Sequence, residues 1–208
     1  MRIAIPIFDQ LTALDAIGPY EVLSRLPEAT VHFIAVEPGP KRSENGMLAV
    51  TADLALAELT DPEVIVFPGG FGTRALMRDE AVLAWLRRAH ETSTWTTSVC
   101  SGALVLAAAG ILDGLRATTH WMVLEMLREY GATPTEERVV EHGKVITAAG
   151  VSAGIDMALL LAAKLADEDI ARAIQLGIEY DPQPPFDSGS VAKAGPETVE
   201  LVKSLRLG

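Results

Sequence analysis

Short apolar runs alternate along the chain with stretches whose apolar residues recur at helical spacing. The apolar runs predict strands at Ile3–Phe8, Val31–Val36, Val64–Phe67, Thr96–Val99 and Val145–Thr147. The helical spacing predicts helices at Ile17–Leu26, Glu80–His90, Ala103–Ala109 and Met122–Tyr130. Strands that alternate with helices indicate parallel βαβ units, and fully apolar strands suit a sheet that is covered on both faces. We therefore expect an α/β fold, a three-layer sandwich around a mainly parallel sheet.

Weaker patterns complete this outline. The segments Met47–Thr51 and Val139–Glu141 predict either an edge strand or a hairpin, and a long apolar helix is expected over Ser152–Leu165. Residues 181–190 are rich in Pro, Gly and Ser and indicate a loop. A closing amphipathic helix is expected over Pro196–Leu205.

The composition is that of a globular domain. With 208 residues and 49% hydrophobic content, the chain can bury one substantial core, so we expect a single domain over residues 1–208. The net charge of -11 repels phosphate backbones and anionic lipid, which argues against nucleic acid or a membrane as partner. No apolar run reaches the roughly 18 residues that a membrane span requires.

The single cysteine bears on the cellular compartment and on metal binding. One cysteine cannot form an internal disulfide, and the sequence has no four-residue Cys/His cluster that would hold zinc. The apolar start is too short for a signal peptide. These features favour a reducing cytoplasm and predict no metal site.

That cysteine, Cys100, stands where a strand pattern changes to a helix pattern. β-Branched residues precede it, and Ala and Leu follow it. A tight turn there pushes the side chain out of the sheet, and the next helix aims free N–H groups at it. This setting predicts a thiolate with a pKa well below the ordinary value of about 8.5. The alternative is a buried cysteine that acts as a small hydrophobic side chain.

Two other loops at the carboxyl ends of predicted strands carry candidate residues, and ligands bind at that edge of parallel sheets. Gly69 and Gly70 follow a buried strand, and the amides of Gly70 and Ser101 could form an oxyanion hole. The glycine pair could equally be a plain turn. Asp15 stands at the entry of the first helix, where it either caps that helix or faces the thiolate and holds a proton for donation.

His120 is the histidine with a claim to this site, because a Cys–His pair is a common way to activate a thiol. A structural role for it is equally consistent with the sequence. His32, His90 and His142 are assigned no role, because their positions indicate solvent or a local partner.

Several motifs in order resemble the DJ-1/PfpI superfamily. They are Leu11–Leu23 around Asp15, Phe67–Gly70, Ser98–Gly102, Ala117–Trp121, Gly150–Asp156 and Ile178–Phe186. The resemblance implies a flavodoxin-like homodimer with Cys100 as nucleophile at a strand-to-helix elbow and Asp15 as its acidic neighbour. Gly69, His120 and Val151 would surround them. The apolar helix expected over Ser152–Leu165 also suits a dimer interface.

Three positions indicate which branch of the superfamily this chain resembles. Most of the superfamily carries glutamate at the acid position, and aspartate at Asp15 resembles the isocyanide hydratase branch. The protease-like members place histidine directly after the cysteine, where this chain has Ser101. Glutamine amidotransferases of the related class place glycine two residues before it, where this chain has Ser98. Peptidase and glutaminase chemistry are therefore not expected.

The resemblance implies a reaction without a cofactor. The Cys100 thiolate would attack the terminal carbon of an isocyanide, and water would hydrolyse the resulting thioimidate to an N-substituted formamide. Asp15 would supply the proton and then activate water, while the Gly70 and Ser101 amides and the Ser101 hydroxyl orient the adduct. Ser101 could instead simply cap the helix. The alternatives are a cofactor-independent glyoxalase and a non-catalytic redox sensor or ligand-binding module based on Cys100.

Overall fold

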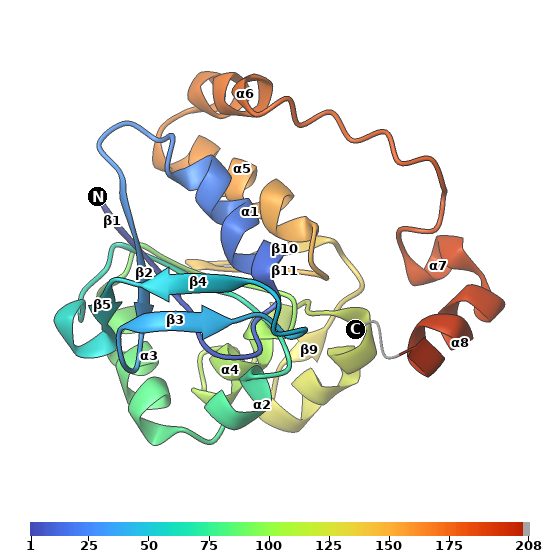
Figure 1. Cartoon of the computed structure of the whole chain (residues 1–208), viewed down its shortest axis with the longest axis horizontal. Coiled ribbons are helices and arrows are strands. Elements are labelled where there is room, and N and C mark those ends of the chain that lie inside the picture. Colours follow the sequence, from blue (N-terminus) through green and yellow to red (C-terminus); the bar gives the residue numbers. More distant parts are fainter. Residues whose placement is uncertain (206–208) are drawn as a thin grey trace. The chain divides into compact units, whose positions relative to one another are not determined.

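A seven-stranded sheet forms the centre of the protein in the computed structural model, which describes residues 1–205 (Figure 1). In spatial order its strands are β10 (Val139–His142), β11 (Val145–Ala148), β7 (Trp95–Val99), β6 (Val64–Phe67), β1 (Arg2–Pro6), β2 (Thr30–Ala35) and β5 (Leu54–Ala55). Every neighbouring pair is parallel except β10 and β11. The five strands predicted with a clear apolar pattern are all present, and the mainly parallel sheet is confirmed.

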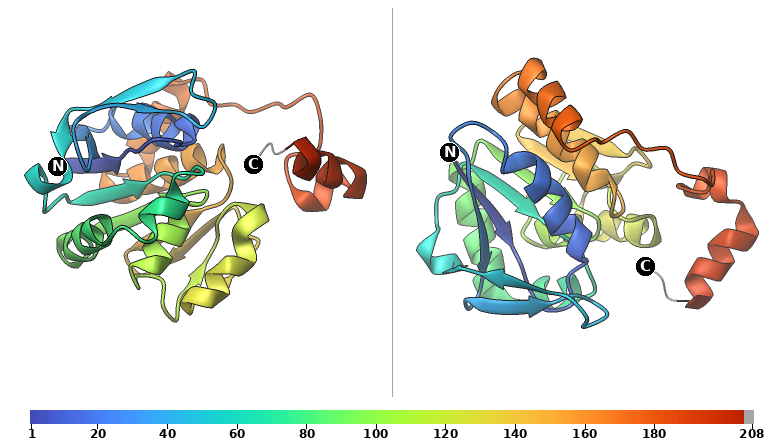
Figure 2. Two further views of the ribbon diagram at one scale, coloured as in Figure 1. Left: turned by 60° about the horizontal axis from the view of Figure 1, so that its bottom comes forward. Right: turned by 45° about the horizontal axis from the view of Figure 1, so that its top comes forward.

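Helices cover both faces of this sheet (Figures 1 and 2). One layer contains α1 (Ala13–Leu23), α5 (Ala153–Leu165) and α6 (Glu168–Gly177), and the other contains α2 (Thr73–Leu76), α3 (Glu80–Thr92) and α4 (Gly102–Ala108). All four residues of β6 are buried, as expected for a strand between two helical layers. The predicted three-layer sandwich is therefore confirmed.

Local sequence explains where several elements begin and end. Asp79 caps α3 by accepting hydrogen bonds from the N–H groups of Ala81 and Val82. Asp167 caps α6, which the sequence analysis did not predict, by accepting from the N–H of Ile170 at 2.8 Å. The helix predicted at Met122–Tyr130 is instead a 3-10 helix, η2 (Trp121–Tyr130), and it ends at Gly131 with a φ of 79°.

The two weak strand patterns have different outcomes. The Met47–Thr51 pattern gives β4 (Ala49–Ala52), which pairs with β3 (Gly39–Arg42) in a separate antiparallel hairpin. The Val139–Glu141 pattern gives β10 at the edge of the main sheet. The short elements that were not predicted include β5, α2, η1 (Leu56–Glu58) and the pair β8 (Arg116–Ala117) and β9 (Thr133–Pro134).

The described chain forms two compact units, Met1–Ile178 and a second that begins at Glu179. The second contains the predicted loop, then α7 (Val191–Ala194) and the predicted closing helix, α8 (Pro196–Leu205). The single domain expected over residues 1–208 stays a prediction. Among the described residues, no helix is long and apolar enough to cross a membrane.

Candidate active site

The loops that follow β1, β6, β7 and β11 come together at the carboxyl ends of these neighbouring parallel strands. They bring Asp15, the Gly69–Gly70 turn, Cys100 and Val151 into one site, all within the first compact unit. Ligand sites of parallel sheets lie at this edge. The three loops that the sequence analysis singled out therefore do converge.

Cys100 occupies a strained turn between β7 and α4. Its φ is 55°, a conformation that costs a residue with a Cβ roughly 1–2 kcal/mol. Hydrogen bonds on both sides hold the turn: the Cys100 N–H donates to the Ala148 and Ala149 carbonyls, and the Thr119 hydroxyl donates to the Cys100 carbonyl at 2.6 Å. The predicted strand-to-helix elbow is confirmed.

The elbow also requires a glycine two residues after the cysteine, at Gly102, where α4 begins. A Cβ on Gly102 would lie 2.2 Å from the Phe67 carbonyl oxygen and 2.8 Å from that of Pro68. The first turn of α4 therefore rests directly on the backbone that leaves β6. This close approach brings the cysteine loop and the glycine turn together.

The thiol of Cys100 lies below the surface, with only 6% of the residue exposed. Burial raises the pKa of Cys100, and a negative charge on Asp15 raises it further. The N–H groups of Ser101 and Val151 hydrogen-bond to the sulfur and act in the opposite direction. The predicted low pKa is therefore wrong for this structure, because desolvation outweighs the amides at the start of α4.

Asp15 is fully buried and belongs to the first turn of α1. The N-cap position of α1 belongs to Thr12, so the helix-cap alternative for Asp15 is wrong. The Asp15 Oδ2 atom accepts a hydrogen bond from the Gly69 N–H at 2.9 Å, and the carboxyl group also hydrogen-bonds to Cys100. Burial raises the pKa of Asp15 to about 8, so the carboxyl group holds its proton at neutral pH.

Three consecutive N–H groups of the turn after β6 bind three side chains from different parts of the fold. Gly69 donates to Asp15 of α1, Gly70 donates to the Ser101 hydroxyl at 2.9 Å, and Phe71 donates to the Glu44 carboxylate at 3.0 Å. Glu44 lies in the β3–β4 hairpin. The turn therefore fixes the positions of the groups around Cys100 and is more than a plain turn.

This arrangement changes the expected role of Gly70. Its N–H is already bonded to the Ser101 hydroxyl, so it is not a free oxyanion donor here. Gly70 has a φ of 131°, and a Cβ there would lie 2.4 Å from the Gln10 carbonyl oxygen. Glycine is thus required for the path of the backbone. The amides that do face the sulfur belong to Ser101 and Val151.

The Ser101 side chain faces the glycine turn. Ser101 stands at the N-cap position of α4, but its hydroxyl makes no capping hydrogen bond. Instead it lies 3.2 Å from the Gly70 carbonyl oxygen and 3.3 Å from the hydroxyl of the buried Thr73. The helix-cap alternative for the Ser101 side chain is therefore wrong.

Comparison with known proteins agrees with this geometry. The model of the DJ-1/PfpI family matches residues 1–164. The chain belongs to the DJ-1/PfpI family. It is 43% identical to the isonitrile hydratase of Pseudomonas putida over 190 residues, which is 91% of this chain and 83% of that protein. The crystal structure of a ThiJ/PfpI family protein from Pseudomonas syringae is similar, with a TM-score of 0.92 at 38% identity, covering 98% of this chain and 86% of the other.

Another relative belongs to a different functional class. An HTH-type transcriptional regulator of Pseudomonas aeruginosa is 30% identical over 183 residues, covering 86% of this chain but 52% of the regulator. The match thus leaves about half of the regulator's length without a counterpart in this chain.

One predicted member of this DJ-1/PfpI site, His120, lies further from the sulfur. The Nδ1 atom of His120 accepts a hydrogen bond from the Met122 N–H at 3.4 Å, and burial lowers the pKa of His120. A Cβ on Gly150 would lie 2.7 Å from the His120 ring, so that ring packs against the loop that carries Val151. His120 therefore packs against the loop whose Val151 N–H donates to Cys100. Within the described part of the chain, no hydrogen bond joins His120 to the Cys100 sulfur.

Glu44 is the site residue that the sequence analysis missed. Its carboxylate is bonded to the glycine turn, and its charge raises the pKa values of both Asp15 and Cys100. A glutamate in a Ser43–Gly46 turn has the pattern of an ordinary solvated hairpin, so nothing local in the sequence singles it out. Within residues 1–205, no group of three His, Cys, Asp or Glu side chains could hold a metal ion.

Proposed function

We propose that this protein hydrates isocyanides to N-substituted formamides at Cys100. The observation that carries the proposal is the fully buried Asp15 carboxyl group, which keeps its proton at neutral pH and hydrogen-bonds to the one cysteine at the elbow. An isocyanide carbon needs both a nucleophile and a proton, and this pair can supply both. The likeness to an isonitrile hydratase supports the same chemistry.

The first half of the reaction forms the covalent adduct. In the reactive form, Asp15 is protonated and the single negative charge of the pair lies on the Cys100 sulfur, where the Ser101 and Val151 N–H groups stabilise it. This form is the minor one, because the pKa of Cys100 lies above that of Asp15. The thiolate attacks the terminal carbon of R–N≡C, and Asp15 delivers its proton to that same carbon. The product is the thioimidate R–N=CH–S–Cys100 with Asp15 as carboxylate.

The second half releases the formamide. The Asp15 carboxylate takes a proton from water as the water oxygen adds to the thioimidate carbon, and it passes that proton to the nitrogen. The tetrahedral adduct then collapses: its hydroxyl proton is transferred to Asp15, the C=O bond forms and the C–S bond breaks. Cys100 thiolate and protonated Asp15 are regenerated, so one water is consumed for each R–NH–CHO formed.

A direct assay tests the proposal. Purified protein with p-nitrophenyl isocyanide should produce the N-substituted formamide, and Cys100→Ala should abolish turnover while the protein still unfolds cooperatively. A protein that forms no formamide but converts methylglyoxal to lactate would instead be the glyoxalase. Failure of both reactions would leave the redox-sensor alternative.

The expected homodimer also belongs to this proposal. It rests on the family resemblance and on apolar side chains left at the surface of α1 and α5, where Leu14 is 42% and Leu160 38% exposed. Sedimentation should give about twice the 22.2 kDa chain mass at micromolar concentration, and a species of 22.2 kDa alone would contradict the dimer. The cytoplasmic location stays a prediction.

A further inference from the structure

Glu44 brings a negative charge to the edge of the site without taking part in the chemistry. It is exposed, while Asp15 and Cys100 are buried. Its backbone N–H donates to the Leu11 carbonyl at 3.1 Å, and its Oε1 atom accepts from the Phe71 N–H at 3.0 Å. Two hydrogen bonds thus hold this hairpin residue against the loops that carry Asp15 and the glycine turn.

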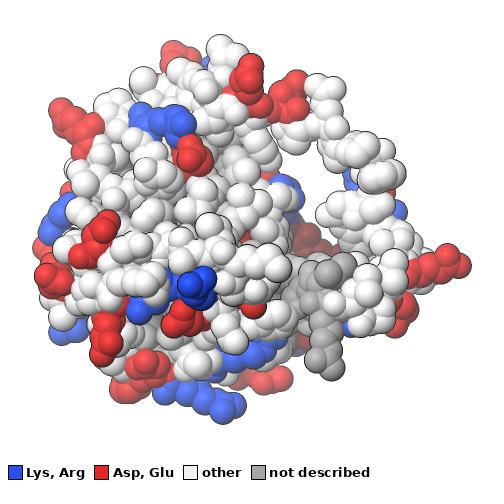
Figure 3. All heavy atoms as spheres, in the orientation of Figure 1, with Lys and Arg blue, Asp and Glu red and all other residues white. Residues whose placement is uncertain are grey.

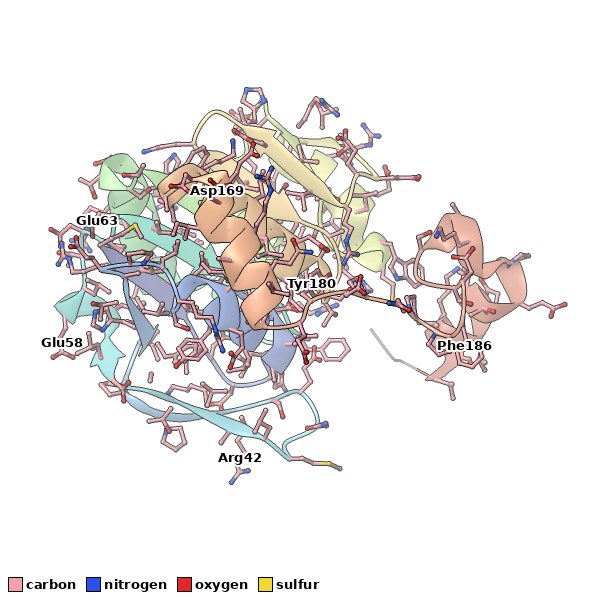
Figure 4. The ribbon with its side chains drawn as sticks, turned by 90° about the horizontal axis from the view of Figure 1, so that it is seen from above. Arg42, Glu58, Glu63, Asp169, Tyr180 and Phe186 are labelled. Atoms are coloured by element: carbon pink, nitrogen blue, oxygen red, sulfur yellow. The ribbon has the colours of Figure 1, made fainter. Side chains whose placement is uncertain are left out.

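No cation of the described chain neutralises this carboxylate by an ion pair; none of the ion pairs within residues 1–205 includes Glu44. Arg42, on the same hairpin, points outward in Figure 4 and donates Nη1 to the Gly46 carbonyl. Arg74 lies 4.9 Å from the centre of the Phe71 ring. Of these three charges, only that of Glu44 acts on Asp15 and Cys100 enough to shift their pKa values.

We propose that Glu44 determines specificity: its carboxylate, held against the Phe71 N–H beside the reactive pair, disfavours anionic substrates and restricts the enzyme to uncharged or cationic isocyanides. The inference rests on the proposed isocyanide hydration for the identity of the substrate. A fixed charge next to a site changes the local concentration of charged ligands and the energy of any charge that enters. The substrate class therefore follows from one exposed residue outside the catalytic pair.

Alkylation of Cys100 tests the charge without depending on hydration. Iodoacetamide and iodoacetate differ in charge and react with the same single thiol. Glu44→Gln keeps an oxygen acceptor for the Phe71 N–H and removes the charge, so it should raise the iodoacetate-to-iodoacetamide rate ratio about three- to tenfold at low salt. This gain should shrink at 0.5 M salt because of screening.

A matched control separates the local charge from the net charge. Glu91→Gln makes the same substitution at another exposed glutamate, near the end of α3 that precedes the amino end of β7. Its rate ratio should stay within about twofold of the wild type. An unchanged ratio in Glu44→Gln, or an equal change in both variants, would overturn the proposal.

A comparison of a neutral and an anionic isocyanide provides a second test of the role of Glu44. p-Nitrophenyl isocyanide and 4-isocyanobenzoate have nearly the same shape and differ in charge. The wild type should favour the nitro compound in kcat/KM, and Glu44→Gln should narrow this preference about three- to tenfold. Equal narrowing in Glu91→Gln, or none in Glu44→Gln, contradicts the role of Glu44. Absence of turnover with both isocyanides would instead contradict the proposed function, while the alkylation result would still stand.

Discussion

At the scale of single residues, the site depends on where two buried protons reside. Asp15 and Cys100 both have pKa values raised by burial. A negative charge on Asp15 raises the pKa of Cys100 further, whereas the hydrogen bond with Cys100 lowers the pKa of Asp15. Two negative charges in this pocket are therefore costly, and one is tolerated where the Ser101 and Val151 amides face the sulfur. Asp15 is the proton donor in the form of the pair whose single charge lies on the sulfur.

Asp15→Asn tests that assignment. Asn is the same size as the protonated carboxyl group and can still accept the Gly69 hydrogen bond, so the fold should be kept. It cannot deliver a proton, and kcat/KM on p-nitrophenyl isocyanide should fall by roughly 10²-fold or more. Asp79→Asn is the matched control, because Asn caps a helix about as well as Asp and α3 lies outside the site. Wild-type turnover in Asp15→Asn would contradict the mechanism.

The same residue makes stability depend on pH. Folding raises the pKa of Asp15 from an ordinary value of 3.8 to about 8, so the folded state binds a proton that the unfolded chain has released at neutral pH. Its contribution to stability is fully present below pH 4 and is lost as the pH rises towards 8. Between pH 5 and pH 9, the free energy of unfolding of Asp15→Asn should therefore gain about 2 kcal/mol or more relative to the wild type. Urea unfolding of both proteins at both pH values measures this difference. If the free energies of unfolding of the two proteins change equally with pH, the pKa of Asp15 is not raised in the folded state.

At the scale of elements, the elbow depends on the contact between the start of α4 and the end of β6. The sequence signal for the elbow is local, since β-branched residues change to Ala and Leu around Cys100, and the structure confirms the elbow that this signal predicts. The partners of the turn were not predictable in the same way. Gly70 was expected to be a free donor, and only the folded chain brings the Ser101 hydroxyl to its N–H.

Gly102→Ala should disturb this contact. The added Cβ would meet backbone oxygen at 2.2 Å, and backbone cannot move as a side chain can. We expect a loss of about 1–3 kcal/mol in the free energy of unfolding, as for overpacking in a core, together with slower alkylation of Cys100. Gly177→Ala is the control, because a Cβ at this helical glycine meets nothing within 4 Å. Equal stability of the two variants would contradict the close packing of α4 on β6.

At the scale of the whole molecule, local sequence patterns predict the arrangement of strands and helices well, but they do not predict the electrostatics of the site. The five main strands and the two helical layers follow from periodicity, which each segment carries in itself. The raised pKa of Cys100 and the position of Glu44 depend on contacts between distant segments, so no local pattern contains them. Lys and Arg also do not gather into one basic patch on the face shown in Figure 3, where they alternate with Asp and Glu.

The second compact unit should be dispensable for the stability of the first. The buried hydrophobic side chains of the described chain all lie between Ile3 and Ile174, and no residue from 179 to 205 is buried. A chain that ends at Ile178 should therefore unfold within about 1 kcal/mol of the full-length protein. Urea unfolding of the two chains gives the comparison. A loss of several kcal/mol would mean that the segment from residue 179 onward supports the core.

The turn at residues 69–71 has a consequence for how this loop can vary. Its three successive N–H groups are matched one by one to Asp15, Ser101 and Glu44. Insertion or deletion of a single residue there would shift all three pairings together, which no substitution of one partner can do. The length of this turn is therefore a fixed dimension of the protein.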